Sequence, residues 1–241
     1  PLEVKITLDN MKYRHLNYFS FIRYSNLDLI SPPFIDDFKD DFIKNELEYK
    51  KVYNLLKDSK SKEIFIKVLN FKMTYDLEFM NGFKNNHEGQ YFDLEYLPKF
   101  NNIKFLDGGG YVGDTLPSII KNYPNYEKIF LIEPNKLHLN IAKRDFGDRR
   151  DIEFINCGLG LKKIIYNDEF VSNNCNHNYQ ANNINSIDNL IKEKIDFIKL
   201  DIEGAEQDAI MGAINTIKKY HPVLAICIYH KAEDWYKIPN I

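Results

Sequence analysis

The stretch "FLDGGGYVGD", residues 105–114, carries the feature that decides the fold. Gly108, Gly110 and Gly113 match the pattern G-x-G-x-x-G, which joins a strand to a helix in nucleotide-binding α/β folds. An apolar run precedes these glycines and a helical pattern follows them. Asp107 stands immediately before the first glycine, so the turn is acidic as well as glycine-rich. The stretch therefore predicts a ligand site at the end of a strand.

On both sides of this turn, short apolar strands alternate with helical patterns. We expect strands at residues 103–106, 129–133, 152–157, 197–201 and 223–229. We expect helices at residues 115–122 (with Asp114 as N-cap), 136–145 and 205–220. Alternation of this kind requires right-handed crossovers between parallel strands. The predicted fold class is α/β, a Rossmann-like, doubly wound and mostly parallel sheet. An Asn-rich segment, residues 172–185, is predicted to be an exposed loop.

The N-terminal part of the chain has a different composition, rich in Phe, Tyr, Lys and Asp and poor in Gly. Residues 36–58 carry apolar side chains at helical spacing and predict an amphipathic helix, in one or two pieces. Residues 61–75 repeat the pattern, with Ser61 as a candidate N-cap. We therefore predict a mainly helical region at residues 1–87 and a ligand-binding domain at residues 88–241.

The composition argues against a nucleic-acid-binding protein and against a membrane-spanning one. The chain has 241 residues, is 44% hydrophobic and has a net charge of −3, without the basic surface expected of a nucleic-acid binder. Cys157, Cys175 and Cys227 are widely spaced and predict reduced thiols in a cytoplasmic protein. We expect no membrane span and no signal peptide. Because the chain starts without Met and stops at "WYKIPNI", we expect a trimmed fragment.

Polar residues follow all five predicted strands, at the sheet edge where α/β folds bind ligands. In chain order, they are Asp107; Glu133; Cys157 and Gly158; Asp201 and Glu203; and His230. Strands commonly end in polar turns, but a set of this kind on one edge indicates a site.

The first two strand ends indicate the cofactor. Backbone N–H groups at the start of a helix suit a pyrophosphate, but the carboxylate of Asp107 would repel one. A cationic amine would be attracted to Asp107, and Glu133 could accept both hydroxyls of a ribose. An adenosyl group with an amino-acid tail has both features, so we predict S-adenosylmethionine. The alternative is that Asp107 only caps a turn.

The fourth strand contains an unusual charge. Lys199 lies in an apolar strand, where an unpaired ammonium is costly to bury, and Asp201 is the expected partner on the same face. This pair could be structural or could place Asp201 beside the reacting atoms. Glu203 could cap the following helix or act in catalysis. Asp201, Glu203 and His230 could together hold a divalent ion, although no sequence signature requires a metal.

The chain resembles the FkbM family of S-adenosylmethionine-dependent methyltransferases over residues 88–241. The resemblance rests on "FLDGGGYVGDT", "LIEPN", "SIDNLIKEKIDFIKLDIEGAEQDAIMGA" and "HPVLAICIYHKAEDWYKIP", with "GQYFD" before them. It implies a seven-stranded Rossmann-like fold, of which the last two strands are missing here, and O-methylation of sugars or natural products, as in polysaccharide biosynthesis. It implies cofactor binding by Gln90, Tyr91, Asp107, Gly109, Gly113, Asp114, Glu133, Cys157 and Gly158. It implies that Lys199, Asp201, Glu203 and His230 line the reacting end.

The predicted reaction is an in-line transfer of a methyl group to a hydroxyl of a small-molecule or glycan-precursor acceptor, with His230 or Asp201 as the base. Two alternatives remain open at this point. One is an NAD-dependent, sugar-modifying oxidoreductase that uses the glycine pattern literally. The other is a non-catalytic module that binds S-adenosylmethionine and acts through a partner.

Overall fold

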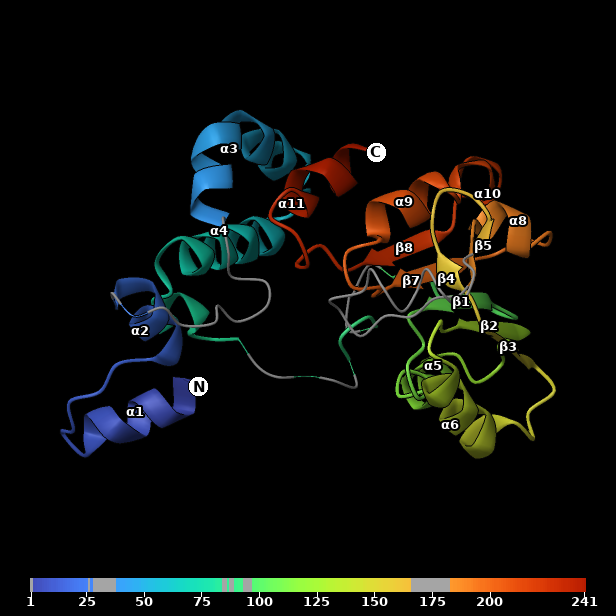
Figure 1. The fold of residues 1–241 in the computed structure, drawn as a ribbon, viewed down its shortest axis with the longest axis horizontal. Helices are drawn as coiled ribbons and strands as arrows, with labels where there is room; N and C mark the ends of the chain where they lie inside the picture. Colours follow the sequence, from blue (N-terminus) through green and yellow to red (C-terminus); the bar gives the residue numbers. More distant parts are fainter. Residues whose placement is uncertain are drawn as a thin grey trace. The chain divides into compact units, whose positions relative to one another are not determined.

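The computed structural model describes residues 2–25, 27, 38–83, 86, 89–92, 97–165 and 183–241. The chain forms two compact units (Figure 1). The first comprises Pro1–Asn85 and Tyr229–Asn240, and the second comprises Asn86–Ile228. The sequence analysis instead assigned the segment after residue 228 to the ligand-binding domain.

A five-stranded sheet forms the centre of the second unit. Its strands are β1 (Lys104–Gly108), β2 (Lys128–Ile132), β3 (Ile152–Ile155), β7 (Phe197–Leu200) and β8 (Val223–Ile226). They lie in the order β3-β2-β1-β7-β8, and every neighbouring pair is parallel. The five predicted strands and the α/β class are therefore confirmed. Because the order turns back between β1 and β7, their carboxyl ends flank a crevice open to a ligand.

Helices cover both faces of this sheet, with α5 and α6 on one side and α8, α9 and α10 on the other (Figure 1). Their bounds are Leu116–Asn122 for α5, Lys136–Phe146 for α6, Ile187–Leu190 for α8, Glu206–Met211 for α9 and Ile214–Tyr220 for α10. The single helix predicted at residues 205–220 is wrong, because it is broken between α9 and α10. Gly212, at the break, lies so close to Gly160 that an added Cβ would stand 2.2 Å from the Gly160 carbonyl oxygen.

Aromatic and aliphatic side chains of the strands form the core of this unit. The rings of Phe105 on β1 and Phe197 on β7 stack with centroids 4.6 Å apart, and both residues are fully buried. Leu116 and Ile119 of α5 close the same cluster. Burial on both faces explains why the strands read as continuous apolar runs in the sequence.

A second, small sheet lies beside the main one. It consists of β4 (Gly158–Leu159), β5 (Ile164–Ile165) and β6 (Asn183–Asn185), in the order β4-β6-β5. The loop predicted for residues 172–185 is thus wrong at its end, where β6 pairs with both neighbours. Residues 172–182, with Cys175, lie outside the described part of the chain.

The first unit is helical. Its helices are α1 (Leu2–Asn10), α2 (Tyr18–Tyr24), α3 (Phe38–Leu55), α4 (Ser59–Thr74), η1 (Leu77–Met80), α11 (Asp234–Lys237) and η2 (Ile238–Asn240). Helix α3 confirms the helix predicted in this segment, and its kink at Asn45 divides it into two pieces, one of the two options that the sequence left open. The N-cap of α4 is Asp58 rather than Ser61, since its carboxylate accepts the Ser61 N–H at 2.7 Å.

Aromatic contacts tie the end of the chain into this helical unit. Trp235 of α11 packs against Phe38 and Phe65, with ring centroids 6.2 and 5.9 Å away. The Tyr49 and Tyr236 rings pack at 5.2 Å, and the Tyr49 hydroxyl donates to Asp41 at 2.7 Å. Large buried rings of this kind contribute strongly to the core of a small helical unit.

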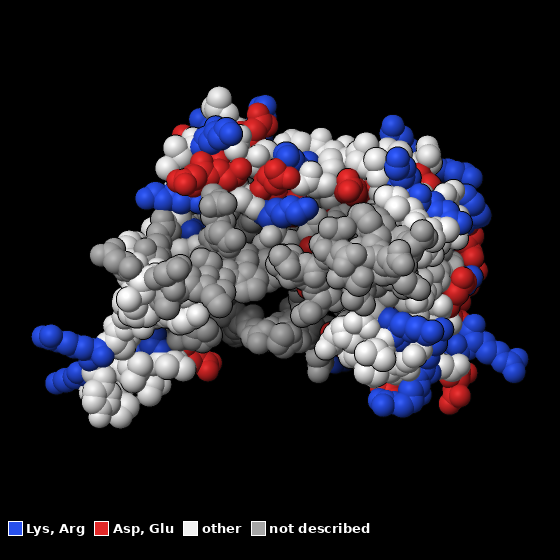
Figure 2. Space-filling view, in the orientation of Figure 1, with Lys and Arg blue, Asp and Glu red and all other residues white. Residues whose placement is uncertain are grey.

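The surface carries mixed charge. In the described part of the face in Figure 2, Lys and Arg side chains lie among Asp and Glu side chains. Within the described ranges, no helix has both the length and the hydropathy needed to cross a bilayer.

Candidate cofactor and active site

A cavity of about 850 Å³ opens beyond the carboxyl ends of β1, β2 and β7, within the second unit. Its lining includes Gln90, Tyr91, Gly109, Tyr111, Asp114, Thr115, Ser118, Glu133, His138, Cys157, Gly158, Leu159, Ile184, Lys199, Asp201 and Glu203. The volume lies in the range of small-molecule sites, and the position is the one that the sheet order favours. The structure thus brings most of the sequence-predicted residues to one cavity.

The glycine turn requires glycine because backbone lies against backbone. Gly109 has φ +75°, and an added Cβ would stand 1.8 Å from the carbonyl oxygen of Asp201. Gly113 has φ +83°, a left-handed conformation that glycine adopts at little cost. The N–H groups of Gly109 and Gly110 both donate to the Ile132 carbonyl at 3.0 Å. These contacts lock β1, β2 and the segment after β7 together at the cavity floor.

Asp107 and Lys199 form a buried ion pair beneath this turn. The Lys199 Nζ lies 2.9 Å from Asp107 Oδ1 and donates to the Gly109 carbonyl at 3.0 Å. Burial is the largest effect on the pKa of Lys199 and lowers it, but the charge and the hydrogen bond of Asp107, together with the charge of Asp201, outweigh burial and raise that pKa. Burial also raises the pKa of Asp107, against the effect of Lys199. Each member of the pair therefore offsets part of what burial costs the charged form of the other.

This pairing corrects two expectations. Lys199 has Asp107, not only Asp201, as its ionic partner, because the β1–β7 register places Asp107 and Lys199 directly opposite each other. Neighbours on adjacent strands stand about 5 Å apart, closer than residues two apart on one strand. Asp107 is fully buried and does not line the cavity, so direct contact with a ligand amine is not supported by its position.

Asp201 belongs to a second polar group, together with Tyr91. The Tyr91 hydroxyl donates to Asp201 Oδ2 at 3.3 Å, accepts from Gln90 Nε2 at 3.2 Å and lies 3.8 Å from Cys227 Sγ. The Lys199 Nζ lies 5.6 Å from the centroid of the Tyr91 ring. Burial raises the pKa of Tyr91, and raises that of the Cys227 thiol to about 12. Tyr91 is therefore a hydroxyl donor to a carboxylate that faces the cavity.

Glu133 follows β2 and organises the other end of the cavity. Its Oε2 accepts the N–H of Tyr111 at 3.0 Å, and its Oε1 accepts the N–H of Asn135 at 2.8 Å. The Nδ1 of His138 lies 3.7 Å from Oε1. Each carboxylate oxygen keeps a lone pair for a further donor. The predicted ribose contact of Glu133 stays a prediction that its geometry allows.

Cys157 and Gly158 lie on the cavity wall beside Leu159 and Ile184. The Cys157 thiol donates to the Gly158 carbonyl at 3.1 Å, and burial raises its pKa to about 11. The thiol is therefore a protonated, weakly polar wall group. A flat, apolar ring could pack on such a surface.

The remaining predicted residues have varied positions. Gly113 closes the glycine turn. Asp114 lines the cavity, but it does not cap α5, because the N-cap of that helix is Thr115. Glu203 lines the cavity with φ +57°, and the N-cap of α9 is Ala205, so Glu203 is not the helix cap. His230 belongs to the first unit, and its catalytic role stays a prediction.

The sequence analysis missed Tyr111, Thr115, Ser118 and His138 as cavity residues. A signal existed for His138, which lies in the first turn of α6, three residues after the N-cap Asn135. The first turn of a helix that follows a strand faces the same sheet edge as the strand end. Tyr111 carried no comparable signal, because its orientation depends on the backbone of the turn.

The fold and this cavity define a class of protein. A parallel sheet in this order, with an acidic glycine turn after β1 and an acid after β2, is a Rossmann-like methyltransferase fold. The family model described as Methyltransferase FkbM domain matches residues 89–240. The chain belongs to the FkbM methyltransferase family, which confirms the resemblance drawn from the sequence.

A solved structure of an FkbM methyltransferase has the same fold. The methyltransferase FkbM from Methylobacillus flagellatus KT matches with a TM-score of 0.83 at 26% identity, covering 99% of this chain and 63% of that one. A SAM-dependent methyltransferase from Aquifex aeolicus has a TM-score of 0.34 at 14% identity, covering 63% of this chain and 71% of its own.

The plantazolicin methyltransferase BpumL, in complex with a pentazolic desmethylPZN analog and SAH, has a TM-score of 0.31 at 14% identity, covering 76% of this chain and 57% of its own. The present chain spans 63% of the length of the Methylobacillus flagellatus methyltransferase FkbM. A comparison with curated protein sequences finds no match.

Proposed function

We propose that this chain binds S-adenosylmethionine in the cavity and methylates a hydroxyl group of a sugar, a glycan precursor or a natural product. The chain belongs to a methyltransferase family, and S-adenosylmethionine is the cofactor of that activity. The finer step, transfer to oxygen, is the proposal. A role in polysaccharide biosynthesis in the cytoplasm accords with reduced thiols at Cys157 and Cys227.

One observation carries the proposal, the acidic lining of the cavity. Among the residues that the structure describes, four carboxylates line it, those of Asp114, Glu133, Asp201 and Glu203. The lysine in the lining, Lys199, is neutralised by Asp107. A sulfonium and an ammonium group are stabilised by such a site, whereas the pyrophosphate of NAD would be repelled. The residues present therefore fit S-adenosylmethionine better than a dinucleotide.

When bound, S-adenosylmethionine supplies a methyl group on a cationic sulfur, ready for in-line attack by an acceptor oxygen. The C–O bond forms as the C–S bond breaks, and the hydroxyl proton must leave. Asp201 faces the cavity and is the carboxylate we assign to that proton. A base in position accelerates such a step by about 10²–10⁴-fold. Tyr91 holds the Asp201 carboxylate, and Lys199 holds the turn beneath the cofactor.

The test begins with calorimetric titration of the protein with S-adenosylmethionine, S-adenosylhomocysteine and NAD. We expect micromolar binding of the first two and none of NAD; binding of NAD alone would overturn the proposal. Labelled S-adenosylmethionine would then be offered with sugars, nucleotide sugars and phenolic acceptors. Label recovered as a methyl ether supports oxygen transfer. Label recovered only on nitrogen or carbon contradicts it, and cofactor binding without any transfer favours a non-catalytic module.

A further inference from the structure

Tyr111 is an unusual residue in the glycine turn. It is half exposed, lines the cavity and has φ +43°, a left-handed conformation that is costly for a bulky side chain. Its ring meets the His138 ring edge to face, with centroids 4.4 Å apart and planes at 71°. The turn therefore places an aromatic ring where glycine or asparagine would satisfy the backbone more easily.

Glu133 holds this conformation in place. Its Oε2 accepts the Tyr111 N–H at 3.0 Å, and its Oε1 lies 3.7 Å from His138 Nδ1. Glu133 is 3% exposed, so a buried carboxylate holds the Tyr111 backbone and lies beside the His138 ring. The carboxylate that could accept ribose hydroxyls is thus also the group that positions the two aromatic side chains.

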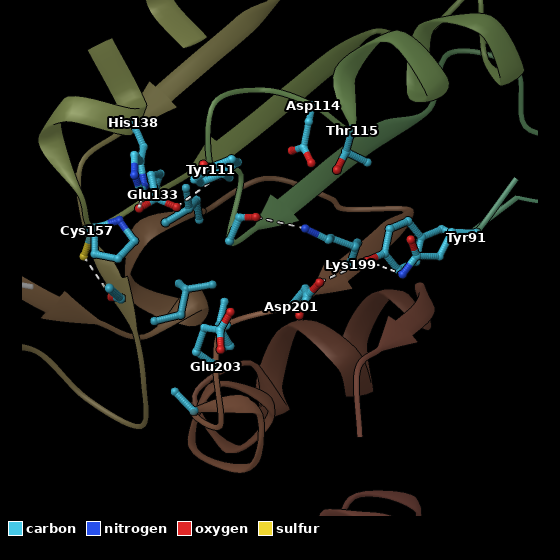
Figure 3. A pocket seen from close by; sticks show the side chains of 18 of the residues that line it. Tyr91, Tyr111, Asp114, Thr115, Glu133, His138, Cys157, Lys199, Asp201 and Glu203 are labelled. Atoms are coloured by element: carbon cyan, nitrogen blue, oxygen red, sulfur yellow. Dashed lines mark hydrogen bonds and ion pairs between the residues drawn. The ribbon is translucent and has the colours of Figure 1, made fainter. Parts of the chain in front are cut away.

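The cavity has two chemically distinct ends. Figure 3 shows Tyr111, Glu133, His138 and Cys157 gathered at one end, and Tyr91, Lys199 and Asp201 at the other. The first end combines aromatic rings and a hydroxyl acceptor with the apolar Leu159 and Ile184, which suits a nucleoside. The second end concentrates charge, which suits proton transfer.

We infer that the Tyr111 ring, backed by His138, packs against the adenosine half of S-adenosylmethionine and determines how tightly that half is bound. The inference deepens the proposed function and rests on it. An aromatic ring stacked on a base changes affinity by about tenfold or more, whichever base is present. Tyr111 is in this sense an affinity-determining residue for the nucleoside half of the ligand.

The experiment compares two ligands, S-adenosylhomocysteine and 5′-methylthioadenosine, which share adenosine but differ in the amino-acid tail. The key variant is Tyr111→Asn, because Asn tolerates the left-handed backbone without the ring. Tyr111→Phe keeps the ring. His138→Ala removes the backing ring, and Leu137→Ala, at a 73% exposed neighbour on α6, is its matched control. Dissociation constants come from calorimetry, and circular dichroism checks folding.

We expect Tyr111→Asn to weaken both ligands about tenfold or more, His138→Ala to weaken both about threefold, and Tyr111→Phe and Leu137→Ala to change neither by more than twofold. Two results would overturn the inference while leaving the proposed function intact. One is unchanged binding of both ligands by Tyr111→Asn. The other is weakening of S-adenosylhomocysteine alone, which would place the ring at the amino-acid tail. Wild-type protein that binds neither ligand would overturn the proposed function itself.

Discussion

The acids that end β1 and β2 differ in what surrounds them. Asp107 is fully buried and is matched by the ammonium of Lys199 at 2.9 Å. Glu133 is 3% exposed, lines the cavity and is matched by two backbone N–H groups. Both residues lie at the ends of neighbouring strands on the same sheet edge, yet Asp107 is buried beneath the glycine turn and Glu133 faces the cavity. The two acids therefore differ in their partners. Asp107, the structural acid, pairs with a buried ammonium group, whereas Glu133, which we propose as the binding acid, accepts backbone N–H groups and keeps capacity for a ligand.

Of the variants that test this comparison between Asp107 and Glu133, Lys199→Met should have the largest effect. This variant leaves the Asp107 carboxylate buried without its cation, and we expect the free energy of unfolding to fall by about 3–5 kcal/mol. Urea denaturation followed by circular dichroism would measure it. Adding Asp107→Asn to the variant should restore much of the loss, because the orphaned charge is then removed.

The matched control for Lys199→Met is Lys128→Met. Lys128 pairs with Glu153 at 2.8 Å and Glu193 at 3.1 Å, but its side chain is 30% exposed. We expect its loss to cost less than about 1 kcal/mol, as for surface pairs. Equal losses for the two lysines would show that the Asp107–Lys199 pair is not special.

Cys157 extends the comparison of buried groups to a thiol. Burial opposes the ionisation of this thiol. Burial raises the pKa of this thiol to about 11, from an ordinary 9.0, so near pH 9 the folded thiol is neutral while the unfolded thiol ionises. The neutral thiol therefore favours the folded state. Its contribution to the free energy of unfolding is fully present below pH 9 and is lost as pH rises through about 11. At pH 8 the fraction of Cys157 present as thiolate should be about a hundredfold lower in the folded protein than in the unfolded protein.

The measurement is iodoacetamide labelling from pH 7 to 11.5, with each cysteine resolved by peptide mass spectrometry. The midpoint of the rate profile separates ionisation from simple shielding, because shielding slows labelling equally at every pH. For Cys157 we expect a midpoint near 11 in the folded protein and near 9 in urea. A folded midpoint near 9 would mean that the wall beside Glu133 is open to water.

Glu133→Gln tests the binding acid. The amide oxygen can still accept one backbone N–H, so we expect only about 1 kcal/mol of lost stability. Binding of S-adenosylhomocysteine should weaken about thirtyfold, since hydrogen bonds from ribose hydroxyls to a carboxylate are stronger than those to an amide. Calorimetry and urea denaturation on the same sample measure both effects. A large stability loss with unchanged binding would assign Glu133 to the structural class of Asp107.

Local patterns were enough to predict the main sheet, because each strand is an apolar run that ends at a polar turn. They were also enough to place Asp201, Glu133 and Gly109 at one edge, since parallel strands end together. The Lys199 partner was not predictable in this way. Its choice depends on register between β1 and β7, whose residues are about ninety positions apart.

The other errors have the same cause. Strand β6 has three residues and too short a pattern for any period, so only its pairing with β4 and β5 defines it. The break between α9 and α10 depends on the contact of Gly212 with Gly160, which the helical pattern does not contain. The Tyr111 ring enters the cavity through a left-handed turn that its residue type does not favour. In each case, tertiary contact overrides local preference.

The smallest expected effect separates the two ends of the cavity. Tyr91→Phe keeps the ring near Lys199 and removes the hydroxyl that donates to Asp201 at 3.3 Å. We expect about 0.5–1 kcal/mol of lost stability in urea and less than a twofold change in S-adenosylhomocysteine binding. Under the proposed function the ligand is bound from the Glu133 end, whereas Tyr91 would act on a carboxylate that is needed only when an acceptor proton must leave. If Tyr91→Phe weakened that binding tenfold, the Tyr91 hydroxyl would have to contact the cofactor, and its assignment to Asp201 would fail.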